Sequence, residues 1–323
     1  YSKLVNAVLR KACGKKKNFL LETNPIRNLP EWLQKSWESN YGKVRTQKIA
    51  EQIIKLPNLD INIKKLEFDK KSWSNIFDGK NIFKQIVRIE HSKGEISKVP
   101  FYKEGKWWVQ NLSSSFAVEI INHYFKKKIL TTKKILEIGS APGGKTAQLL
   151  DYGFDVTAIE ISKERIKRLK ENLTRLSLRT KIINKDILKW NNKHSYDCVL
   201  IDAPCSGTGI IRKKPEILIN IHKKKLAPLT EKQKLILEKI SKMISVKGLI
   251  IYTVCSIEIE EGRNQIEKFL MKNKNFKLLD IDNEIFGNIE LRNINGMIEI
   301  TPECNESIGG ADGFFVASLQ RVY

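Results

Sequence analysis

Residues 199–209 read VLIDAPCSGTG, and residues 252–256 read YTVCS. Each stretch is an apolar run that leads to a cysteine, and the 323 residues hold only five cysteines. A short apolar run bounded by Pro and Gly is typical of a buried strand in a parallel sheet. Ligands of open α/β sheets bind beyond the carboxyl ends of such strands, and neighbouring strands lie about 4.8 Å apart. The sequence therefore predicts that Cys205 and Cys255 face one crevice and reach one small substrate.

The pattern around these two runs alternates between strand and helix from residue 111 onward. The expected strands are 134–139, 155–161, 181–185, 196–203 and 249–255. The expected helices are 144–152, 163–177, 231–244 and 260–271, and residues 276–281 and 313–319 are expected to form a terminal pair of strands. Such alternation predicts an α/β fold with a doubly wound, mostly parallel Rossmann-like sheet and helices on both faces.

The first 110 residues are organised differently. Residues 1–22 follow a short helical pattern that ends in three lysines. Residues 23–110 combine a helical pattern at 30–37 with strand patterns, which predicts a small α+β module. The strand patterns lie at 59–63, 82–89 and 106–110. The Trp107-Trp108 pair in the last of them is more typical of buried aromatic residues than of a surface on which bases stack.

The charge of the chain points to a polyanionic partner. The net charge is +22, from 58 Lys and Arg against 36 Asp and Glu. Residues 1–110 hold 23 basic against 11 acidic residues, a net +12, whereas residues 111–323 hold 35 against 25, a net +10. A strongly basic chain favours nucleic acid as its partner. A general bias of the composition toward Lys, Asn and Ile is the alternative explanation.

Several classes of protein are excluded by the composition. No apolar run approaches the roughly 20 residues of a membrane span, and the basic N-terminal stretch lacks the apolar segment of a signal peptide. The five cysteines are widely spaced and odd in number, so we expect free thiols and a reducing cytoplasm. No CxxC pair or His cluster suggests a metal site. We expect a cytoplasmic monomer without a metal ion or a membrane partner.

Residues 139–146 read GSAPGGKT, which formally fits the phosphate-binding P-loop of nucleotide triphosphatases. Asp202 would then hold magnesium at the end of an apolar run. Pro142 argues against this interpretation, because a P-loop binds phosphates through successive backbone N–H groups and proline has none.

The acidic residues that follow the second and third expected strands favour a different cofactor. Glu160 lies 21 residues after Gly139, a spacing that suits an acid bonded to ribose hydroxyls. Asp186 is placed to bond the amino group of an adenine. A nucleoside cofactor without phosphates, such as S-adenosylmethionine, fits this pattern. The candidate cofactor-binding residues are Gly139, Ser140, Ala141, Pro142, Gly143, Gly144, Lys145, Glu160, Asp186 and Asp202.

Two cysteines beside a sulfonium cofactor permit methylation of cytosine at C5. That carbon becomes nucleophilic only when a thiolate has added to C6 and a group near N3 stabilises the developing charge. A base or a second thiol must then assist release. Cys255, Asp202 and Cys205 supply these groups, and Lys145 together with the sulfonium favours the thiolate. Basic side chains at 212–214 are candidates for contacts with phosphates around the target nucleotide.

The chain resembles the Nol/Nop/Sun family of RNA cytosine-5 methyltransferases. The resemblance is carried by APGGKT at 141–146, DAPCSGTG at 202–209, VCS at 254–256 and GADGFF at 310–315, in the order and spacing of the family. It implies a class I methyltransferase domain over 111–323 and S-adenosylmethionine as the cofactor. It also implies an RNA substrate. Within the family the chain is most similar to the Sun branch, which acts on 16S ribosomal RNA. Residues 23–110 resemble an RRM-like RNA-binding module, and residues 1–22 resemble the last helix of a NusB-like domain.

The resemblance also implies a role for each cysteine. The nucleophile of the family falls on Cys255, and the cysteine that assists product release falls on Cys205. DNA cytosine methyltransferases instead attack with the cysteine of a Pro-Cys motif, which here would be Cys205. The second cysteine at 255 favours the RNA family. The chain departs from the family pattern at Gly139, Asn111 and Val254, and the first of these lies in the cofactor loop.

We therefore expect S-adenosylmethionine-dependent methylation of cytosine C5 in RNA, with 16S ribosomal RNA as the substrate and rRNA processing as the context. Transfer RNA is the alternative substrate. A P-loop nucleotide triphosphatase and a non-catalytic RNA-binding ribosome assembly factor are the alternatives from other classes.

Overall fold

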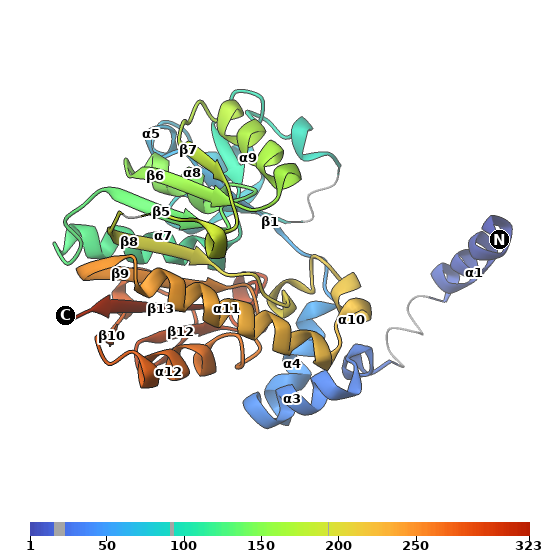
Figure 1. The fold of residues 1–323 in the computed structure, drawn as a ribbon. Helices are drawn as coiled ribbons and strands as arrows, with labels where there is room; N and C mark the ends of the chain where they lie inside the picture. The colour runs from blue at the N-terminus through green and yellow to red at the C-terminus, as the bar shows by residue number, and fades with distance from the viewer. Residues whose placement is uncertain (16–22, 91–93, 193) are drawn as a thin grey trace.

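The computed structural model describes residues 1–15, 23–90, 94–192 and 194–323. A nine-stranded mixed sheet forms its centre in the order β11-β12-β13-β9-β8-β5-β6-β7, with β10 paired to β13 (Figure 1). The strands are β5 (Lys134–Ile138), β6 (Asp155–Glu160), β7 (Lys181–Asn184), β8 (Tyr196–Asp202), β9 (Ile244–Val254), β10 (Phe276–Leu279), β11 (Arg292–Ile294), β12 (Met297–Ile300) and β13 (Phe314–Arg321). Strands β5 to β9 are parallel, and β10 to β13 add antiparallel pairings.

Helices cover both faces of this sheet. They are α7 (Leu112–Lys126), α8 (Gly144–Asp151), α9 (Lys163–Arg175), α11 (Leu226–Ser241) and α12 (Arg263–Lys272). The short helix α10 (Glu216–Asn220) packs instead against a cluster formed by residues 29–53. The centre of strand β8 is continuously apolar because its side chains are buried on both faces of the sheet. Cys198 and Leu200 pack with α7, whereas Val199 and Ile201 pack with α11 and α12 on the opposite face. Burial of both faces is the rule for a parallel sheet enclosed by helices.

The first 110 residues form a second, smaller sheet with the order β2-β3-β1-β4, antiparallel throughout. Its strands are β1 (Leu59–Ile63), β2 (Gly79–Phe83), β3 (Ile86–Ile89) and β4 (Trp107–Val109), and its short helices are α5 (Lys65–Phe68) and α6 (Trp73–Ile76). This arrangement confirms a small α+β module before the larger sheet. Trp107 and Trp108 are buried, as expected, and donate their indole N–H groups within the protein.

Two helices connect the N-terminal part to the larger domain. They are α3 (Glu31–Tyr41) and α4 (Lys43–Ile53), which pack on each other. Leu33, Trp37 and Ile49 form a buried cluster with Ile211 and Ile257, two residues that lie a few positions after the two cysteines. The helices therefore support the loops that carry the cysteines.

Helix α1 (Ser2–Gly14) confirms the helical pattern at the start of the chain. None of its side chains is buried, and Figure 1 draws it apart from the rest of the structure. Of the lysines that follow it, those at 16 and 17 lie outside the described residues. The NusB-like origin of residues 1–22 and the domain boundaries at 22 and 110 stay predictions. No helix in the described part of the chain has the length and apolar character needed to cross a membrane.

Two element assignments differ from the sequence analysis. Residues 82–89 are not one strand, because β2 ends at Phe83 and Lys84 adopts a left-handed φ of 44° in a tight turn. The helix expected at 231–244 begins earlier, at Leu226, since Pro228 is compatible with a first helical turn. It ends at Ser241, and Ile244 already belongs to β9, which is longer than predicted.

Candidate active site

A cleft of about 580 Å³ lies beyond the carboxyl ends of β5, β6, β8 and β9. Six of the predicted site residues line it together: Gly139, Glu160, Asp186, Asp202, Cys205 and Cys255. The remaining predicted residues, from Ser140 to Lys145, are not among its lining residues and form the turn that leads into α8. The arrangement follows from the parallel order of the strands, because their carboxyl ends meet at one edge of the sheet.

The two cysteine sulfur atoms lie 3.5 Å apart within this cleft. Strands β8 and β9 are parallel neighbours, with Asp202 opposite Thr253, so the residues that follow them are brought together. A hydrogen bond to Cys255, burial and nearby negative charge raise the pKa of the Cys205 thiol well above its usual value. Cys205 is therefore protonated near neutral pH, and either sulfur can be the donor in its contact with the other.

Asp202 is held in place by two donors at the floor of the cleft. Its Oδ2 lies 2.8 Å from Lys145 Nζ, and its Oδ1 accepts a hydrogen bond of 3.2 Å from Thr253 Oγ1. Burial acts to lower the pKa of Lys145, but attraction to Asp202 outweighs it and the pKa is raised. Lys145 is thus charged and committed to an internal carboxylate. The lysine that would contact phosphate in a P-loop is therefore already occupied by Asp202.

Glycines shape the cofactor loop at its two ends. Gly139 has a φ of +76°, and a Cβ atom there would lie 2.4 Å from the carbonyl oxygen of Asp202. Gly143 has a φ of +106° and precedes the first residue of α8, where a Cβ atom would lie 2.7 Å from Leu169 Cδ1. Only glycine fits these positions without displacement of a neighbour. In this chain the departure from the family pattern at Gly139 therefore has a structural reason.

The two predicted cofactor acids occupy different environments. Glu160 is 2% exposed and accepts a hydrogen bond of 3.0 Å from the backbone N–H of Ser162. Its other oxygen lies 3.3 Å from an Arg165 nitrogen and 3.4 Å from the backbone nitrogen of Ala141. Asp186 Oδ1 caps the short helix Ile187–Lys189 by accepting from the backbone of Leu188. Both carboxylates are oriented by the protein before any ligand is present.

The chain matches the family described as 16S rRNA methyltransferase RsmB/F over residues 128–320. The chain belongs to this family. Membership confirms the resemblance seen in the sequence, an S-adenosylmethionine-dependent RNA methyltransferase as the class of enzyme, and S-adenosylmethionine as its cofactor. It removes the P-loop nucleotide triphosphatase from consideration.

Individual relatives of this RsmB/F chain agree with the assignment. The "Ribosomal RNA small subunit methyltransferase B" of Photorhabdus laumondii is 29% identical over 98% of the chain and 73% of its own length. The protein of the same name from Salmonella paratyphi B is 28% identical over 83% of the chain and 64% of its own length. The chain thus spans about two thirds to three quarters of these relatives. The structure of NSun6 from Pyrococcus horikoshii with SFG has a TM-score of 0.72 at 18% identity, over 91% of the chain and 98% of that protein, and shows the same fold.

The RsmB/F site also contains residues that the sequence analysis did not identify. Glu261 is buried and accepts hydrogen bonds from the backbone and the hydroxyl of Ser206 and from Gln233. The hydroxyl of Ser256 lies 3.1 Å from that of Ser206. These contacts tie the residue after Cys205 to the residue after Cys255. No local spacing signals them, because 55 positions separate Ser206 from Glu261.

The basic turn after Cys205 is largely committed to contacts within the protein. Arg212 donates to the carbonyl oxygens of Gly309 and Leu56, and Lys213 Nζ lies 2.7 Å from Asp312 Oδ2. Only Lys214 of the three lines the cleft. Of these three residues, Lys214 therefore remains the candidate for a contact with phosphate. Within the described residues no group of three or more His, Cys, Asp or Glu side chains is arranged to hold a metal ion.

Proposed function

We propose that the chain transfers a methyl group to C5 of a cytosine in 16S ribosomal RNA, with Cys255 as the nucleophile. The observation that carries this proposal is the pair of thiols 3.5 Å apart beside the Lys145–Asp202 ion pair, at one end of a cleft lined by Glu160 and Asp186. A substrate ring at this end contacts the reacting sulfur and the charged pair, while the opposite end holds a nucleoside.

The residues of the cleft suit the cofactor of this family. Glu160 and Asp186 are preoriented carboxylates of the kind that accept hydrogen bonds from ribose hydroxyls and an adenine amino group. When bound, S-adenosylmethionine supplies the methyl group. Gly139 lets the loop after β5 pass directly against the backbone of Asp202, where a side chain would not fit.

Attack begins at the sulfur of Cys255. Its thiolate forms a bond to C6 of the cytosine, which moves electron density toward N3 and makes C5 nucleophilic. Asp202 and the charged Lys145 act together at N3, because the carboxylate of Asp202 orients the ammonium group of Lys145, which supplies the positive charge and the proton. C5 then takes the methyl group.

Release requires loss of the proton on C5 and cleavage of the bond between C6 and the sulfur of Cys255. The Cys205 sulfur is the second sulfur within reach. Once the Cys205 thiol has lost its own proton to solvent, its raised pKa makes the thiolate a competent base for the C5 proton. Departure of the Cys255 thiolate restores the aromatic ring. The two cysteines therefore have different roles, one in attack and one in release.

As part of this proposal the enzyme acts as a cytoplasmic monomer without a metal ion. The five cysteines, all within the described residues, are free thiols, which suits a reducing compartment.

The substrate is tested by methylation of RNA from a strain that lacks the gene. The purified chain and tritiated S-adenosylmethionine are incubated separately with 16S rRNA, small ribosomal subunits and transfer RNA, and bisulfite sequencing locates the product. We expect one labelled cytosine in 16S rRNA. Label in transfer RNA alone would favour the alternative substrate, and no label in any RNA would contradict the proposal.

A further inference from the structure

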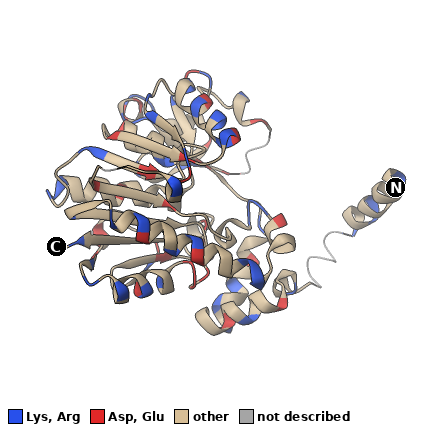
Figure 2. Ribbon diagram, viewed as in Figure 1, with Lys and Arg blue, Asp and Glu red and all other residues tan. Residues whose placement is uncertain are grey.

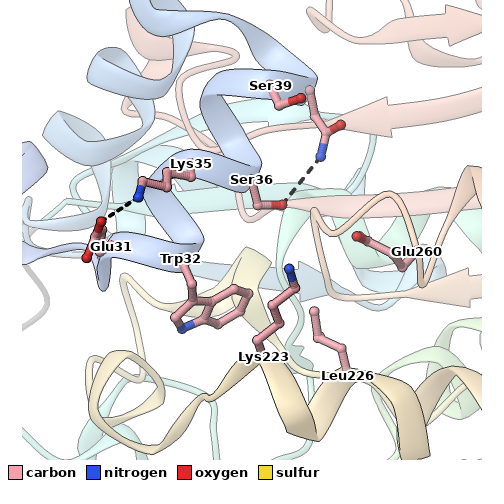
Figure 3. Close-up of a pocket in the computed structure, with 9 residues that line it drawn as sticks. Glu31, Trp32, Lys35, Ser36, Ser39, Lys223, Leu226 and Glu260 are labelled. Atoms are coloured by element: carbon pink, nitrogen blue, oxygen red, sulfur yellow. Dashed lines mark hydrogen bonds and ion pairs between the residues drawn. The ribbon is translucent and has the colours of Figure 1, made fainter.

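A second cavity, of about 540 Å³, lies between α3 and the start of α11, outside the active-site cleft (Figure 3). It shares no lining residue with the cleft. Its walls come from α3, from the short helix Lys223–Lys225 that precedes α11, and from the loop after β9. The volume is within the range of sites that bind small molecules or single nucleotides.

Three polar groups around this cavity have no partner in the described part of the chain. Trp32 Nε1 is a buried donor without an acceptor, and Glu260 Oε2 is a buried acceptor without a donor. The ammonium group of Lys223 forms no ion pair, whereas Lys35 at the rim is paired with Glu31. Buried polar groups in native proteins are almost always hydrogen-bonded, and a bound water or a polar atom of a ligand would supply these partners.

These groups combine an aromatic ring, a cation and a carboxylate. Figure 3 shows the Trp32 ring, the Lys223 ammonium group and the Glu260 side chain around the same space. Aromatic rings stack with nucleobases, lysines contact phosphates, and a carboxylate accepts from the amino or imino groups of a base. Glu260 makes the cavity unsuitable for a phosphate alone, because a phosphate offers no donor to a carboxylate.

The chain connects this cavity to the active site in two places. Glu216 and Ile217 of α10 line the active-site cleft, and the same segment continues to Lys223 and Leu226 in the second cavity. On the other side, Glu260 is adjacent to Glu261, whose carboxylate holds the loop of Cys205. The second cavity is therefore linked to the active-site cleft by α10 and the few residues that follow it.

We propose that this cavity binds one nucleotide of the RNA substrate that flanks the target cytosine. Its base lies against Trp32 and donates to Glu260, and its phosphate contacts Lys223. This inference rests on the proposed RNA substrate. It fits the net charge of +22, visible as the many blue Lys and Arg segments of Figure 2. It also fits the three consecutive lysines of the short helix Lys223–Lys225 before α11.

The phosphate contact is tested by Lys223→Ala in the full chain, with Lys224→Ala as the matched control. Lys224 is the adjacent exposed lysine and does not line the cavity. We expect Lys223→Ala to raise the KM for 16S rRNA about tenfold with an unchanged kcat, because the lost bond is to a charged group away from the reacting atoms. The slope of log K against log salt should fall by about 0.7, the value for one phosphate of a single strand. Lys224→Ala should change neither quantity.

The base contact is tested by Trp32 and Glu260 variants and by photo-crosslinking of 16S rRNA that contains 4-thiouridine. We expect Trp32→Ala to raise the KM at least about fivefold and Trp32→Phe to raise it less, since phenylalanine retains the stacking surface. Glu260→Gln should raise the KM, whereas Glu267→Gln, at an exposed position of α12, should not. A crosslinked peptide should contain Trp32.

Failure of this inference is distinguishable from failure of the proposed function. If the wild-type chain methylates 16S rRNA while the Lys223, Trp32 and Glu260 variants keep its KM and no crosslink maps to α3, the cavity does not bind RNA. Tighter binding by Glu260→Gln would show that the carboxylate repels the substrate, which also overturns the inference. Absence of methylation by the wild-type chain would instead overturn the proposed function.

Discussion

Cys205 Sγ lies 3.5 Å from Cys255 Sγ, and the two residues follow neighbouring parallel strands of the central sheet. The separation is well beyond the roughly 2.0 Å of a disulfide bond and suits a hydrogen bond between two thiols. The attacking sulfur and the sulfur that assists release are therefore hydrogen-bonded to each other in the free protein. Formation of a bond from Cys255 to carbon breaks that hydrogen bond and frees Cys205 for the second half of the reaction.

Asp202→Asn should lower kcat by a larger factor than it weakens cofactor binding. The substitution removes the charge that pairs with Lys145 and the group proposed to act at N3. General acid–base contributions are typically about 10²- to 10⁴-fold, so we expect a loss of at least about 10²-fold. Single-turnover methylation gives the rate, and calorimetry with S-adenosylmethionine gives the affinity.

Asp197→Asn is the matched control for this substitution, because Asp197 is an exposed aspartate on the same strand. Its rate should equal that of the wild type. A wild-type rate in Asp202→Asn would exclude Asp202 from the chemistry.

Glu261 is a positioning residue for Cys205, and Glu261→Gln should change the pH dependence of kcat as well as its size. The hydrogen bond to Cys255 is the largest cause of the raised Cys205 pKa, and the negative charge of Glu261 adds to it. Loss of that charge should lower the Cys205 pKa, so the limb of the pH–rate profile on which kcat rises with pH should move to lower pH. A variant with reduced kcat but an unmoved profile would show a purely structural role.

Glu258 makes the stability of the protein depend on pH. Burial raises its pKa to about 7, against a hydrogen bond of 2.8 Å from the indole of Trp37 that acts to lower it. The folded state therefore holds a proton that the unfolded state loses near pH 4.5, and stability falls as the pH rises from about 4.5 to 7. Glu258→Gln should remove this loss and stabilise the protein at pH 8 by up to about 3 kcal/mol.

Urea unfolding at pH 5 and pH 8 measures this effect. The stability difference between Glu258→Gln and the wild type should be larger at pH 8 than at pH 5. Glu267→Gln, at an exposed position, should show no such change. An equal difference at both pH values would mean that Glu258 does not titrate in this range.

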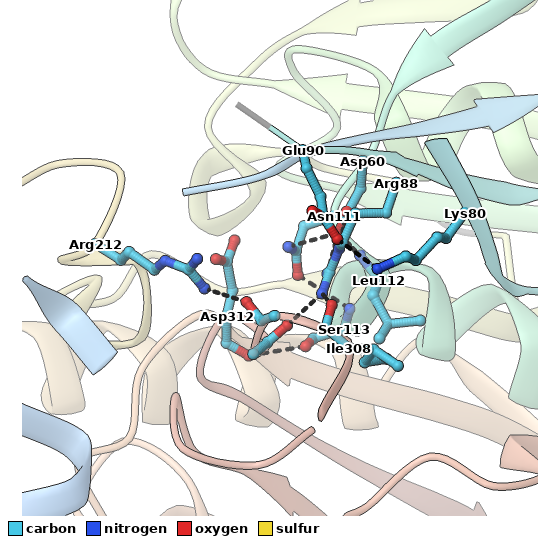
Figure 4. Close-up of polar contacts among 12 residues, drawn as sticks. Asp60, Lys80, Arg88, Glu90, Asn111, Leu112, Ser113, Arg212, Ile308 and Asp312 are labelled. Atoms are coloured by element: carbon cyan, nitrogen blue, oxygen red, sulfur yellow. Dashed lines mark hydrogen bonds and ion pairs between the residues drawn. The ribbon is translucent and has the colours of Figure 1, made fainter. Parts of the chain in front are cut away.

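Asp60 joins the small sheet to the larger domain. It forms a buried ion pair with Arg88, at 2.6 Å, and accepts from Asn111 and the backbone of Leu112, while Arg88 also donates to the carbonyl oxygens of Ile308 and Gly310 (Figure 4). Asp60→Ala leaves a buried guanidinium without its counter-charge. We expect a loss of about 3 kcal/mol in the free energy of unfolding by urea.

Lys98→Ala removes one partner of an exposed ion pair with Glu95 and provides the comparison. Its unfolding midpoint should match that of the wild type. If Asp60→Ala unfolds at the same urea concentration as Lys98→Ala, the buried pair does not hold the two sheets together.

The strands that lead to the two cysteines could be predicted from the sequence. The runs before Cys205 and Cys255 are continuously apolar because helices cover both faces of their strands, and a continuous run with sharp ends is easy to recognise. A site at the carboxyl ends of parallel strands can therefore be predicted from the order of the strands along the chain. This explains why Glu160, Asp186 and Asp202 line one cleft as expected.

Other elements give weaker local signals. Helix α7 was not predicted, because buried residues surround most of its circumference and no polar face marks it. The contact between Trp37 and Glu258 spans 221 positions, and the Glu261–Ser206 contact spans 55. Such contacts depend on how α3 and the loops pack in the folded protein, so the spacing of residues in the sequence does not predict them.

The roles of the two cysteines are tested most directly by trapping the covalent RNA adduct. Cys205→Ala and Cys255→Ala are each incubated with 16S rRNA and S-adenosylmethionine, and denaturing gels followed by mass spectrometry identify any protein–RNA species. Cys205→Ala should accumulate a denaturation-resistant adduct at Cys255, whereas Cys255→Ala should form none and transfer no methyl group. An adduct at Cys205 in the Cys255→Ala variant, with turnover retained, would contradict the account.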